Sequence, residues 1–328
     1  MSQNVNRRSF IAKSLLTPAA GALAMHAVQS STLAADAAVP ARDLPGSKAS
    51  LPTGKIKNLQ VSRLLLGGNL LTHFTHSRDL KYVYNLTAHY NTEEKICQTM
   101  AVAEAHGVNT LVIHTAPGVV SMLKKYRNKQ GGKIQWIICP TAQVDSDPEG
   151  YATQVRELAD EGVDAIYLWG VSADRLVQEG KADMIAKAVE IAKEHGVPSG
   201  VGAHDLRVIQ QCEQKKIDAD FYIKTFHHHN YPSAPKADEL TRVYSEVPGY
   251  WCKNPAEVID FMKGVEKPWI AFKVMAAGAI PPSDAFRYVF NNGADFVLAG
   301  MFDFEIAEDV LVANDALKET KRVRPWRS

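Results

Sequence analysis

Several side chains that could act as acids, bases, nucleophiles or metal ligands lie in or just after apolar runs of this 328-residue chain. Lys224 lies in the run Phe221–Phe226, and Lys273 lies in the run Trp269–Met275. Successive side chains of a strand point to opposite faces, and a lysine that faced an apolar helix layer would be costly. We therefore expect both lysines to point into the enclosed side of the sheet, with His228 at the same parity just above Lys224.

Three histidines are placed where strand ends could bring them together. His114 ends one apolar run, and His204 follows another, with Asp205 directly after it. The third, His228, lies in a row of three histidines. Three imidazoles with an open position suit Zn²⁺, whereas an added carboxylate such as that of Asp205 favours Mn²⁺ or Fe²⁺. The alternative is that the histidines form hydrogen bonds in a lid or a substrate pocket without a metal.

A metal ion at this position could polarise a sugar carbonyl or hydroxyl for isomerisation, epimerisation or elimination. We expect Lys224, Lys273 and Asp205 to act as catalytic residues beside it. The main expectation is therefore a metal-dependent lyase, isomerase or epimerase that acts on a sugar or keto-sugar.

The elements that must position these residues repeat eight times as an apolar β-like run and a helical stretch. The predicted strands span residues 62–67, 110–114, 134–139, 165–169, 199–203, 221–226, 269–275 and 296–299, and a last helix spans 306–321. Glycines follow several of the predicted helices, as C-caps do. The pattern predicts an α/β fold, a single closed (β/α)8 TIM barrel, rather than an open doubly wound sheet. Its active site should lie at the carboxyl ends of the strands.

Glycine-rich loops follow the last two predicted strands and contain Gly278 and Gly300. Loops at these positions of a TIM barrel often hold an anionic group on backbone N–H donors. We therefore expect Gly278 and Gly300 to bind an anion, and the substrate-binding set to include Asn69, His73 and Trp169.

Two long segments, 69–92 after the first strand and 227–254 after the sixth, should emerge at the same face of the barrel. Connections of this length inside a compact domain are usually lids or binding loops. Both segments are rich in histidine and aromatic residues, which suits stacking on sugar rings and equally suits the core of a lid.

The segment Gly54–Gly68 (GKIKNLQVSRLLLGG) looks like the opening of aldo-keto reductases, in which a short hairpin closes the barrel before the first strand. Residues 107–116 and 163–169 also resemble the second and fourth strands of that family. The resemblance covers most of residues 54–300 as architecture, and its specific motifs lie in the first half.

The resemblance implies a catalytic tetrad of Asp, Tyr, Lys and His, from which this sequence departs at every position. The corresponding residues are His114, Val119, Pro140 or Thr141, and Trp169. The NADP phosphate signature near the eighth strand is replaced by residues 293–301. Without the tyrosine no general acid is ready to protonate a carbonyl, so we expect reductase chemistry to be lost and no tight binding of NADP. An NADP-dependent reductase with an altered site is the alternative.

Lys224 and Lys273 on neighbouring strands, with a glycine-rich loop, also resemble the layout of class I deoxyribose-phosphate aldolases. A cationic neighbour would lower the pKa of a nucleophilic lysine. A Schiff-base aldolase and a non-catalytic sugar-binding protein are therefore further alternatives.

The N-terminus contains Arg7-Arg8, then an apolar run from Ser14 to Val28 and small residues near Ala37. This pattern resembles a twin-arginine export signal. We expect a signal peptide at 1–37, a linker or arm at 38–53, a barrel domain at 54–328 and a periplasmic location.

Charge and cysteine content give weaker indications. The chain has 37 Lys and Arg against 36 Asp and Glu, so its net charge of +1 gives no indication of a nucleic acid or membrane-surface partner. The early apolar run is too short to span a bilayer. The four cysteines are widely spaced with no C-x-x-C, so no pairing follows, and we expect buried apolar roles for most of them. They are Cys97, Cys139, Cys212 and Cys252.

Overall fold

The computed structural model describes residues 46–48, 50–240 and 251–328. The predicted signal peptide and residues 38–45 and 49 of the predicted linker lie outside the described residues. Residues 241–250 of the second long segment lie outside them as well. None of the described helices is long and apolar enough to cross a membrane.

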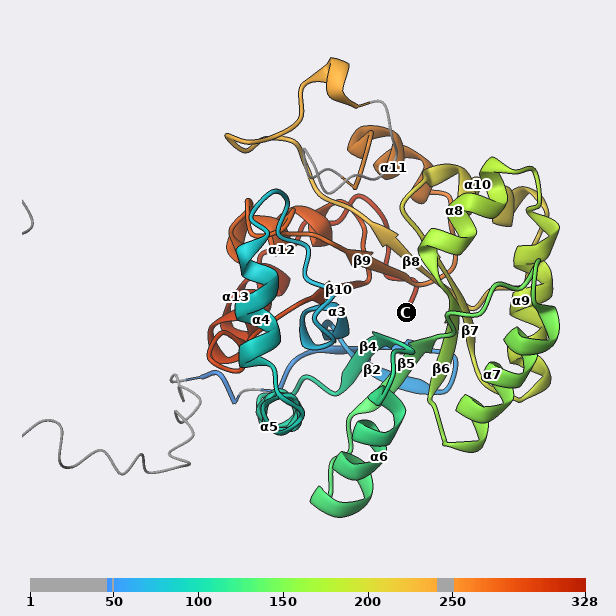
Figure 1. Ribbon diagram of the computed structural model, residues 1–328. Coiled ribbons are helices and arrows are strands. Elements are labelled where there is room, and N and C mark those ends of the chain that lie inside the picture. Colours follow the sequence, from blue (N-terminus) through green and yellow to red (C-terminus); the bar gives the residue numbers. More distant parts are fainter. Residues whose placement is uncertain (1–45, 49, 241–250) are drawn as a thin grey trace, which may run out of the picture. The chain divides into compact units, whose positions relative to one another are not determined.

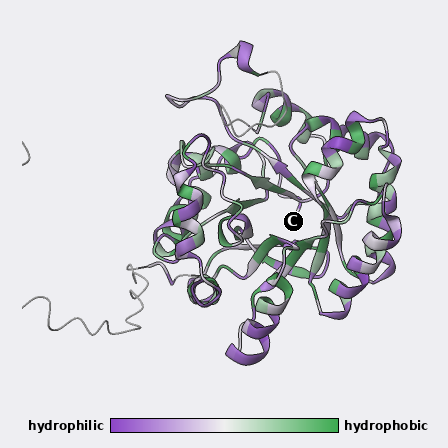
Figure 2. Cartoon of the chain, viewed as in Figure 1, coloured by the Kyte–Doolittle hydropathy of each residue, from purple (hydrophilic) through white to green (hydrophobic). Residues whose placement is uncertain are grey.

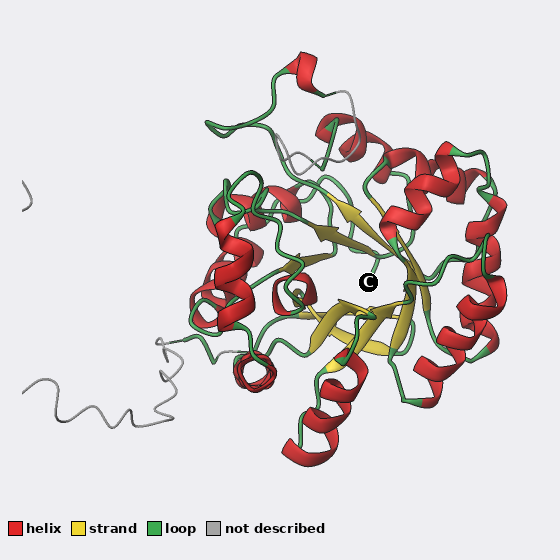
Figure 3. Ribbon diagram, viewed as in Figure 1, coloured by secondary structure: helices red, strands yellow, loops and turns green. Residues whose placement is uncertain are grey.

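Eight parallel strands form a closed barrel, which confirms the predicted TIM-barrel fold (Figure 1, Figure 3). The strands are β3 (Leu64–Gly67), β4 (Thr110–His114), β5 (Gln135–Cys139), β6 (Ala165–Leu168), β7 (Ser199–Ala203), β8 (Phe221–Thr225), β9 (Trp269–Phe272) and β10 (Phe296–Ala299). Each strand pairs with the next along the chain, and β10 closes the barrel on β3 with Val297 opposite Leu64. All eight carboxyl ends therefore meet at one mouth.

An antiparallel hairpin of β1 (Thr53–Ile56) and β2 (Leu59–Ser62) precedes the barrel. Ile56, Leu59 and Val61 belong to the apolar cluster that fills the barrel interior. The hairpin thus closes the amino-terminal end of the barrel, as the sequence predicts, and leaves the opposite end for a site.

Helices surround the strands, with their apolar faces turned inward (Figure 2). They are α3 (Gly68–Leu71), α4 (Tyr82–Tyr90), α5 (Glu93–Ala105), α6 (Val119–Gln130), α7 (Pro148–Asp160), α8 (Gly170–Gln178), α9 (Asp183–Glu194), α10 (Leu206–Gln214), the 3-10 turn η1 (Ala237–Glu239), α11 (Pro255–Met262), α12 (Pro282–Asn291) and α13 (Ile306–Lys318). Side-chain oxygens of Thr92, Asp147 and Asn254 accept backbone N–H groups and cap α5, α7 and α11. The first long segment contains α4 and is therefore partly helical.

Alternation along the strands separates an inner core from the helix layer. Phe221 and Ile223 of β8 belong to the inner cluster, whereas Tyr222 packs with the outer one. Gly200 of β7 makes room for this packing, because a Cβ there would lie 2.4 Å from the Phe221 ring. The interior is thus a packed core, with space only at its carboxyl end.

Strand β9 ends at Phe272, three residues before the predicted end. Lys273, Ala276 and Ala277 have positive φ angles of 55°, 46° and 58°, so the chain turns out of the sheet directly after Phe272. Non-glycine residues seldom adopt this conformation, and they gather at functional sites. The last helix also ends early, at Lys318.

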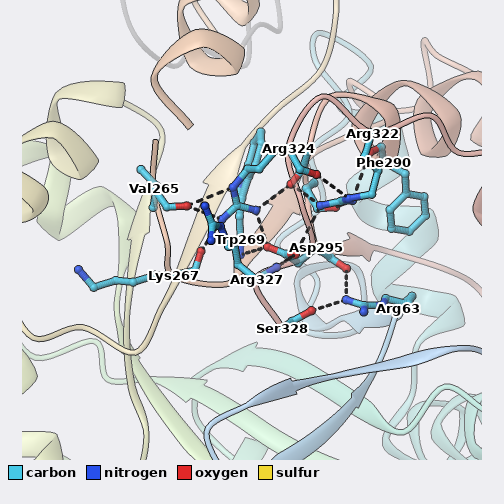
Figure 4. Close-up of polar contacts among 12 residues, drawn as sticks. Arg63, Val265, Lys267, Trp269, Phe290, Asp295, Arg322, Arg324, Arg327 and Ser328 are labelled. Atoms are coloured by element: carbon cyan, nitrogen blue, oxygen red, sulfur yellow. Dashed lines mark hydrogen bonds and ion pairs between the residues drawn. The ribbon is translucent and has the colours of Figure 1, made fainter. Parts of the chain in front are cut away.

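The C-terminal segment packs at the amino ends of β9 and β10, away from the mouth (Figure 4). The buried Arg324 guanidinium forms a 2.7 Å ion pair with Asp295 and donates to the carbonyls of Val265 and Lys267. These contacts tie the two strand ends together and form a stabilising cluster remote from the mouth.

All four cysteines are buried and unbonded to one another, in agreement with the roles expected for most of them.

Candidate functional site

A cavity of about 610 Å³ opens at the carboxyl end of the barrel. Its floor is the last inward-facing layer of strand side chains, namely Val112, Tyr167, Ile223, Phe272 and Leu298. The walls come from residues that follow the strand ends and from the two long segments. Among the predicted site residues, Asn69, Trp169, His204, Lys273, Gly278 and Gly300 line this cavity.

His204 directly follows β7 and is held by a carboxylate from the neighbouring helix α8. Its Nδ1 lies 2.7 Å from Oδ2 of Asp174, and both side chains are buried. The other Asp174 oxygen accepts the backbone N–H groups of His204 at 3.0 Å and Asp205 at 2.9 Å. Oδ1 accepts the two backbone N–H groups and Oδ2 is placed to accept from the ring, so Nδ1 of His204 carries the proton and Nε2 is the basic nitrogen.

Burial, and then the nearby Lys273 ammonium, lower the pKa of His204, while the hydrogen bond that His204 donates to Asp174 opposes this shift. The imidazole is therefore neutral near pH 7. A neutral histidine oriented by a buried carboxylate is the arrangement of a general base.

Lys273 supplies a positive charge to the same cavity. Its Nζ lies 4.7 Å from the centre of the Trp251 ring and 5.4 Å from that of Phe272, within the range of cation–π contacts. Its left-handed backbone conformation, φ 55°, ends β9 at the preceding residue, Phe272. The ammonium is thus placed beside aromatic rings at the mouth, where an oxygen that gains negative charge could pair with it.

A second imidazole, that of His76, lines the cavity from the first long segment. Its Nε2 lies 3.3 Å from the side-chain nitrogen of Asn69, and its ring contacts the Trp251 ring at 5.6 Å. Burial, then the charges of Lys273 and His204, lower the pKa of His76 to about 2. His76 is therefore neutral at all ordinary pH values and can serve as a hydrogen-bonding group.

Lys224 does not line the cavity, which corrects the direction expected from the sequence. It alternates with the inward-facing Ile223, so it points toward the helix layer. There its Nζ donates to the carbonyl and hydroxyl oxygens of Thr225 at 2.7 and 3.1 Å. The ammonium is tolerated because these oxygens bind it and because Asp174 and Asp205 lie near enough to act on its charge. The expectation that Lys224 points inward assumed that the helix layer beside it is apolar, whereas this part of the layer is polar.

The three histidines predicted as metal ligands are not brought together. His204 binds Asp174, the His114 ring stacks with that of Trp169 at 6.5 Å, and His228 lies 3.2 Å from Asp284 of α12. Across the described residues no group of three or more His, Cys, Asp or Glu side chains is placed to hold a metal ion. His114, His204 and His228 therefore do not form the metal-binding group that the sequence predicts.

Asp205 and His73 also lie outside the cavity lining. Asp205 caps α10 by accepting the backbone N–H of Arg207 at 2.9 Å and pairs with its guanidinium. The exposed His73 ring lies 2.8 Å from the carbonyl oxygen of Asn91. Both side chains thus have local structural partners.

Asp174 and His76 are the site residues that the sequence did not single out. Asp174 lies in α8, four residues after the helix begins at Gly170. The one indication in the sequence is that Asp174 lies shortly after β6, and β6 is the neighbour of β7, the strand that His204 follows. His76 is one of several histidines in the first long segment, and nothing in the sequence distinguishes it from His73.

The fold defines the chain as a member of the TIM-barrel class of α/β structures. No protein-family model matches the chain, and no curated protein sequence matches it.

Solved structures show the same fold. A protein of Pseudomonas aeruginosa described as an aldo-keto reductase is 17% identical, with a TM-score of 0.53 over 83% of this chain and 96% of that one. A truncated 3-deoxy-D-arabino-heptulosonate 7-phosphate synthase of Thermotoga maritima is 10% identical, with a TM-score of 0.50 over 82% and 93% of the two chains. At these identities the likeness establishes the TIM-barrel fold alone.

Proposed function

We propose that this chain is a lyase, isomerase or epimerase that moves a proton on a small hydroxylated carbonyl compound, a sugar or keto-sugar. The observation that carries the proposal is the Asp174–His204 pair, whose imidazole lines the same cavity as the Lys273 ammonium. A base and a cation in one mostly apolar cavity suit the removal of a proton next to a carbonyl.

In this mechanism Nε2 of His204 takes the proton from the carbon beside the carbonyl. The electron pair of the broken C–H bond moves to the carbonyl oxygen, and the Lys273 ammonium pairs with the enolate that forms. Asp174 stabilises the imidazolium without taking its proton. Return of the proton to the same carbon from the other face gives an epimer, return to the neighbouring carbon gives an isomer, and loss of a hydroxide gives an elimination product.

The aromatic side chains around the reacting group support this reading. Trp169 and Phe272 line the cavity, are partly exposed, and offer flat apolar surfaces on which a sugar ring can stack. They also exclude water from the enolate, which strengthens its pairing with Lys273. No step is assigned to a metal ion, because the expected ligands do not fit one.

The altered tetrad supports the loss of reductase chemistry. His114, Val119 and Trp169 stand where the aldo-keto reductase pattern has Asp, Tyr and His. We also propose export to the periplasm, which Arg7-Arg8 supports, and changing both arginines to lysine should retain the protein in the cytoplasm.

A Schiff base on Lys273 is the second candidate, because this lysine lines the cavity. Against it, Lys224 points into the helix layer and offers no second ammonium inside the cavity to lower the pKa of Lys273. Trapping with borohydride in the presence of keto-sugars distinguishes the two: a covalent adduct on Lys273 would replace the enolate mechanism.

The test is a screen of ketoses, aldoses and sugar acids for isomerisation, epimerisation or dehydration, followed by NMR. His204→Ala and Lys273→Met should each lower the rate of the reaction found by at least about 100-fold. His195→Ala, at the exposed end of α9, is the matched control and should leave the rate unchanged. Turnover that survives His204→Ala would refute the proposal.

A further inference from the structure

The cavity extends from the barrel mouth to the first turn of α13, where Glu305 and Asp309 line it. Asp309 is only 5% exposed. Within the described part of the chain its carboxyl group forms no hydrogen bond and no ion pair, although it reaches the cavity wall. This end of the cavity thus presents a buried acid that lacks a protein partner among those residues.

A neighbouring residue shows how this chain satisfies a buried carboxylate with a structural role. Asp303, also buried, accepts a 2.6 Å hydrogen bond from the Tyr90 hydroxyl and lies 3.2 Å from the ammonium of Lys95. Asp309 has neither kind of partner. A carboxylate buried without a donor or a cation is costly, and such groups gather at binding and catalytic sites.

The local charges add to this cost. Burial, followed by repulsion from Glu305 and Glu308, raises the pKa of Asp309 to about 7. The charges that act on Asp309 come from its own helix and the residue that caps it. Those that act on His204 and His76 come from the barrel mouth. The cavity therefore has a cationic end at Lys273 and an anionic end at Asp309.

Favourable interaction with the helix dipole does not explain a buried side chain here. An acid in the first turn of a helix stabilises it, and the exposed Glu308 supplies this interaction without desolvation. Asp309 would gain as much from an exposed position. Its burial against the cavity calls for another reason.

We propose that Asp309 binds the protonated amino group of the cavity's ligand, so that this ligand is an amino-substituted sugar or a related amine. The proposal rests on the function proposed above, since it assigns the other end of the same ligand. A hydroxyl group would satisfy one oxygen of Asp309 but would leave the negative charge of Glu305 and Asp309 uncompensated. A phosphate would be repelled, whereas a bound cation offsets both the burial and the repulsion of the ionised carboxylate.

The probes are benzylamine and benzyl alcohol, which have similar shapes and differ in charge. Their affinities for the full chain are measured by NMR titration at pH 8. Benzylamine should bind at least about tenfold more tightly, because a charge-assisted hydrogen bond is stronger than a neutral one. Asp309→Asn should abolish the preference. Glu308→Gln, one residue away and exposed, is the control and should retain it.

A second measurement uses the unmodified protein and keeps the proposal testable if Asp309→Asn does not fold. Between pH 8 and pH 5.5 Asp309 becomes protonated, and the affinity for benzylamine should fall more than tenfold while that for benzyl alcohol stays constant.

Equal affinities of the two probes, or a preference that survives Asp309→Asn, would overturn the proposal. Tighter binding of inorganic phosphate than of benzylamine, lost on Asp309→Asn, would overturn it as well. The proposed proton-transfer function is tested separately. If that function is right, His204→Ala should remove turnover, and it should leave the preference for benzylamine intact.

Discussion

Replacing Asp174 with asparagine should abolish the proposed proton transfer without unfolding the protein. Oδ1 of Asp174 accepts two backbone N–H groups, and an amide oxygen can keep both. The amide nitrogen would then face Nδ1 of His204, where Oδ2 now lies at 2.7 Å. An N–H group there requires Nδ1 to accept, so the proton of His204 moves to Nε2 and the base is lost.

The size of the effect follows from two contributions. A charge-assisted hydrogen bond is worth about 1.5–3 kcal/mol, which alone lowers a rate by about 10–100-fold. Inversion of the tautomer adds to this, and in a serine protease triad the same change lowers kcat by about 10⁴. We expect a decrease in turnover of about 10²–10⁴-fold, with the free energy of unfolding lowered by no more than about 2 kcal/mol.

The assay is the rate at which the substrate's C–H hydrogen exchanges with solvent, with His204 observed by ¹⁵N NMR. The wild-type ring should have its proton on Nδ1 and the Asp174→Asn ring on Nε2. Asp183→Asn, at an exposed position of α9, is the matched control and should change neither. An Asp174→Asn protein that keeps the wild-type rate would refute the assignment of His204 as the base.

Three further predictions concern other buried titratable groups. Lys224→Met should leave turnover within about threefold of wild type, because Lys224 lies outside the cavity and a buried charge is often replaced by an apolar side chain at little cost. A loss of turnover as large as that of Lys273→Met would contradict this placement. His227 is fully buried, and burial lowers its pKa from 6.5 to about 3. The unfolded chain therefore binds a proton that the folded chain does not, so the free energy of unfolding falls as the pH falls below about 6.5. His227→Leu should therefore reduce the pH dependence of the unfolding free energy between pH 4 and 6 by about 1.4 kcal/mol per pH unit, as measured by urea denaturation. An unchanged pH dependence would show that the pKa of His227 is not lowered in the folded protein. Arg324→Met should lower the free energy of unfolding by about 3 kcal/mol, because Asp295 loses its 2.7 Å ion-pair partner, and it should leave turnover unchanged. A loss of turnover in this variant would show that the C-terminal cluster acts on the site.

The fold was predictable because each strand and helix carries its own local signal. Runs of apolar residues mark the strands, and six of the eight begin at the predicted residue and end within three residues of the predicted end. The late part of the seventh run misleads, because Val274 and Met275 are as apolar as the strand before them. Only the positive φ of Lys273 ends β9, and that conformation depends on the packing of the mouth.

The site was predictable only in part. Position at or just after a strand end was enough to place His204, Asn69 and Trp169 at the cavity. Lys273 was expected to point inward from within a strand, whereas it lines the cavity because β9 ends just before it. The direction of Lys224 depends on whether Phe221 and Ile223 face the barrel interior or the helix layer. The sequence does not decide this, because both faces of β8 carry apolar side chains near Lys224. Asp174 reaches His204 from another β/α unit, so their pairing depends on tertiary geometry that spacing along the chain does not reveal.

Exchange of deuterium from D₂O into the carbon beside the carbonyl of a sugar tests the central claim most directly. The wild-type protein should catalyse this exchange on at least one keto-sugar, and His204→Ala should lower the rate by at least about 100-fold with or without a chelator. Exchange that persists in His204→Ala, or that chelation abolishes in the wild type, would contradict a metal-independent base formed by Asp174 and His204.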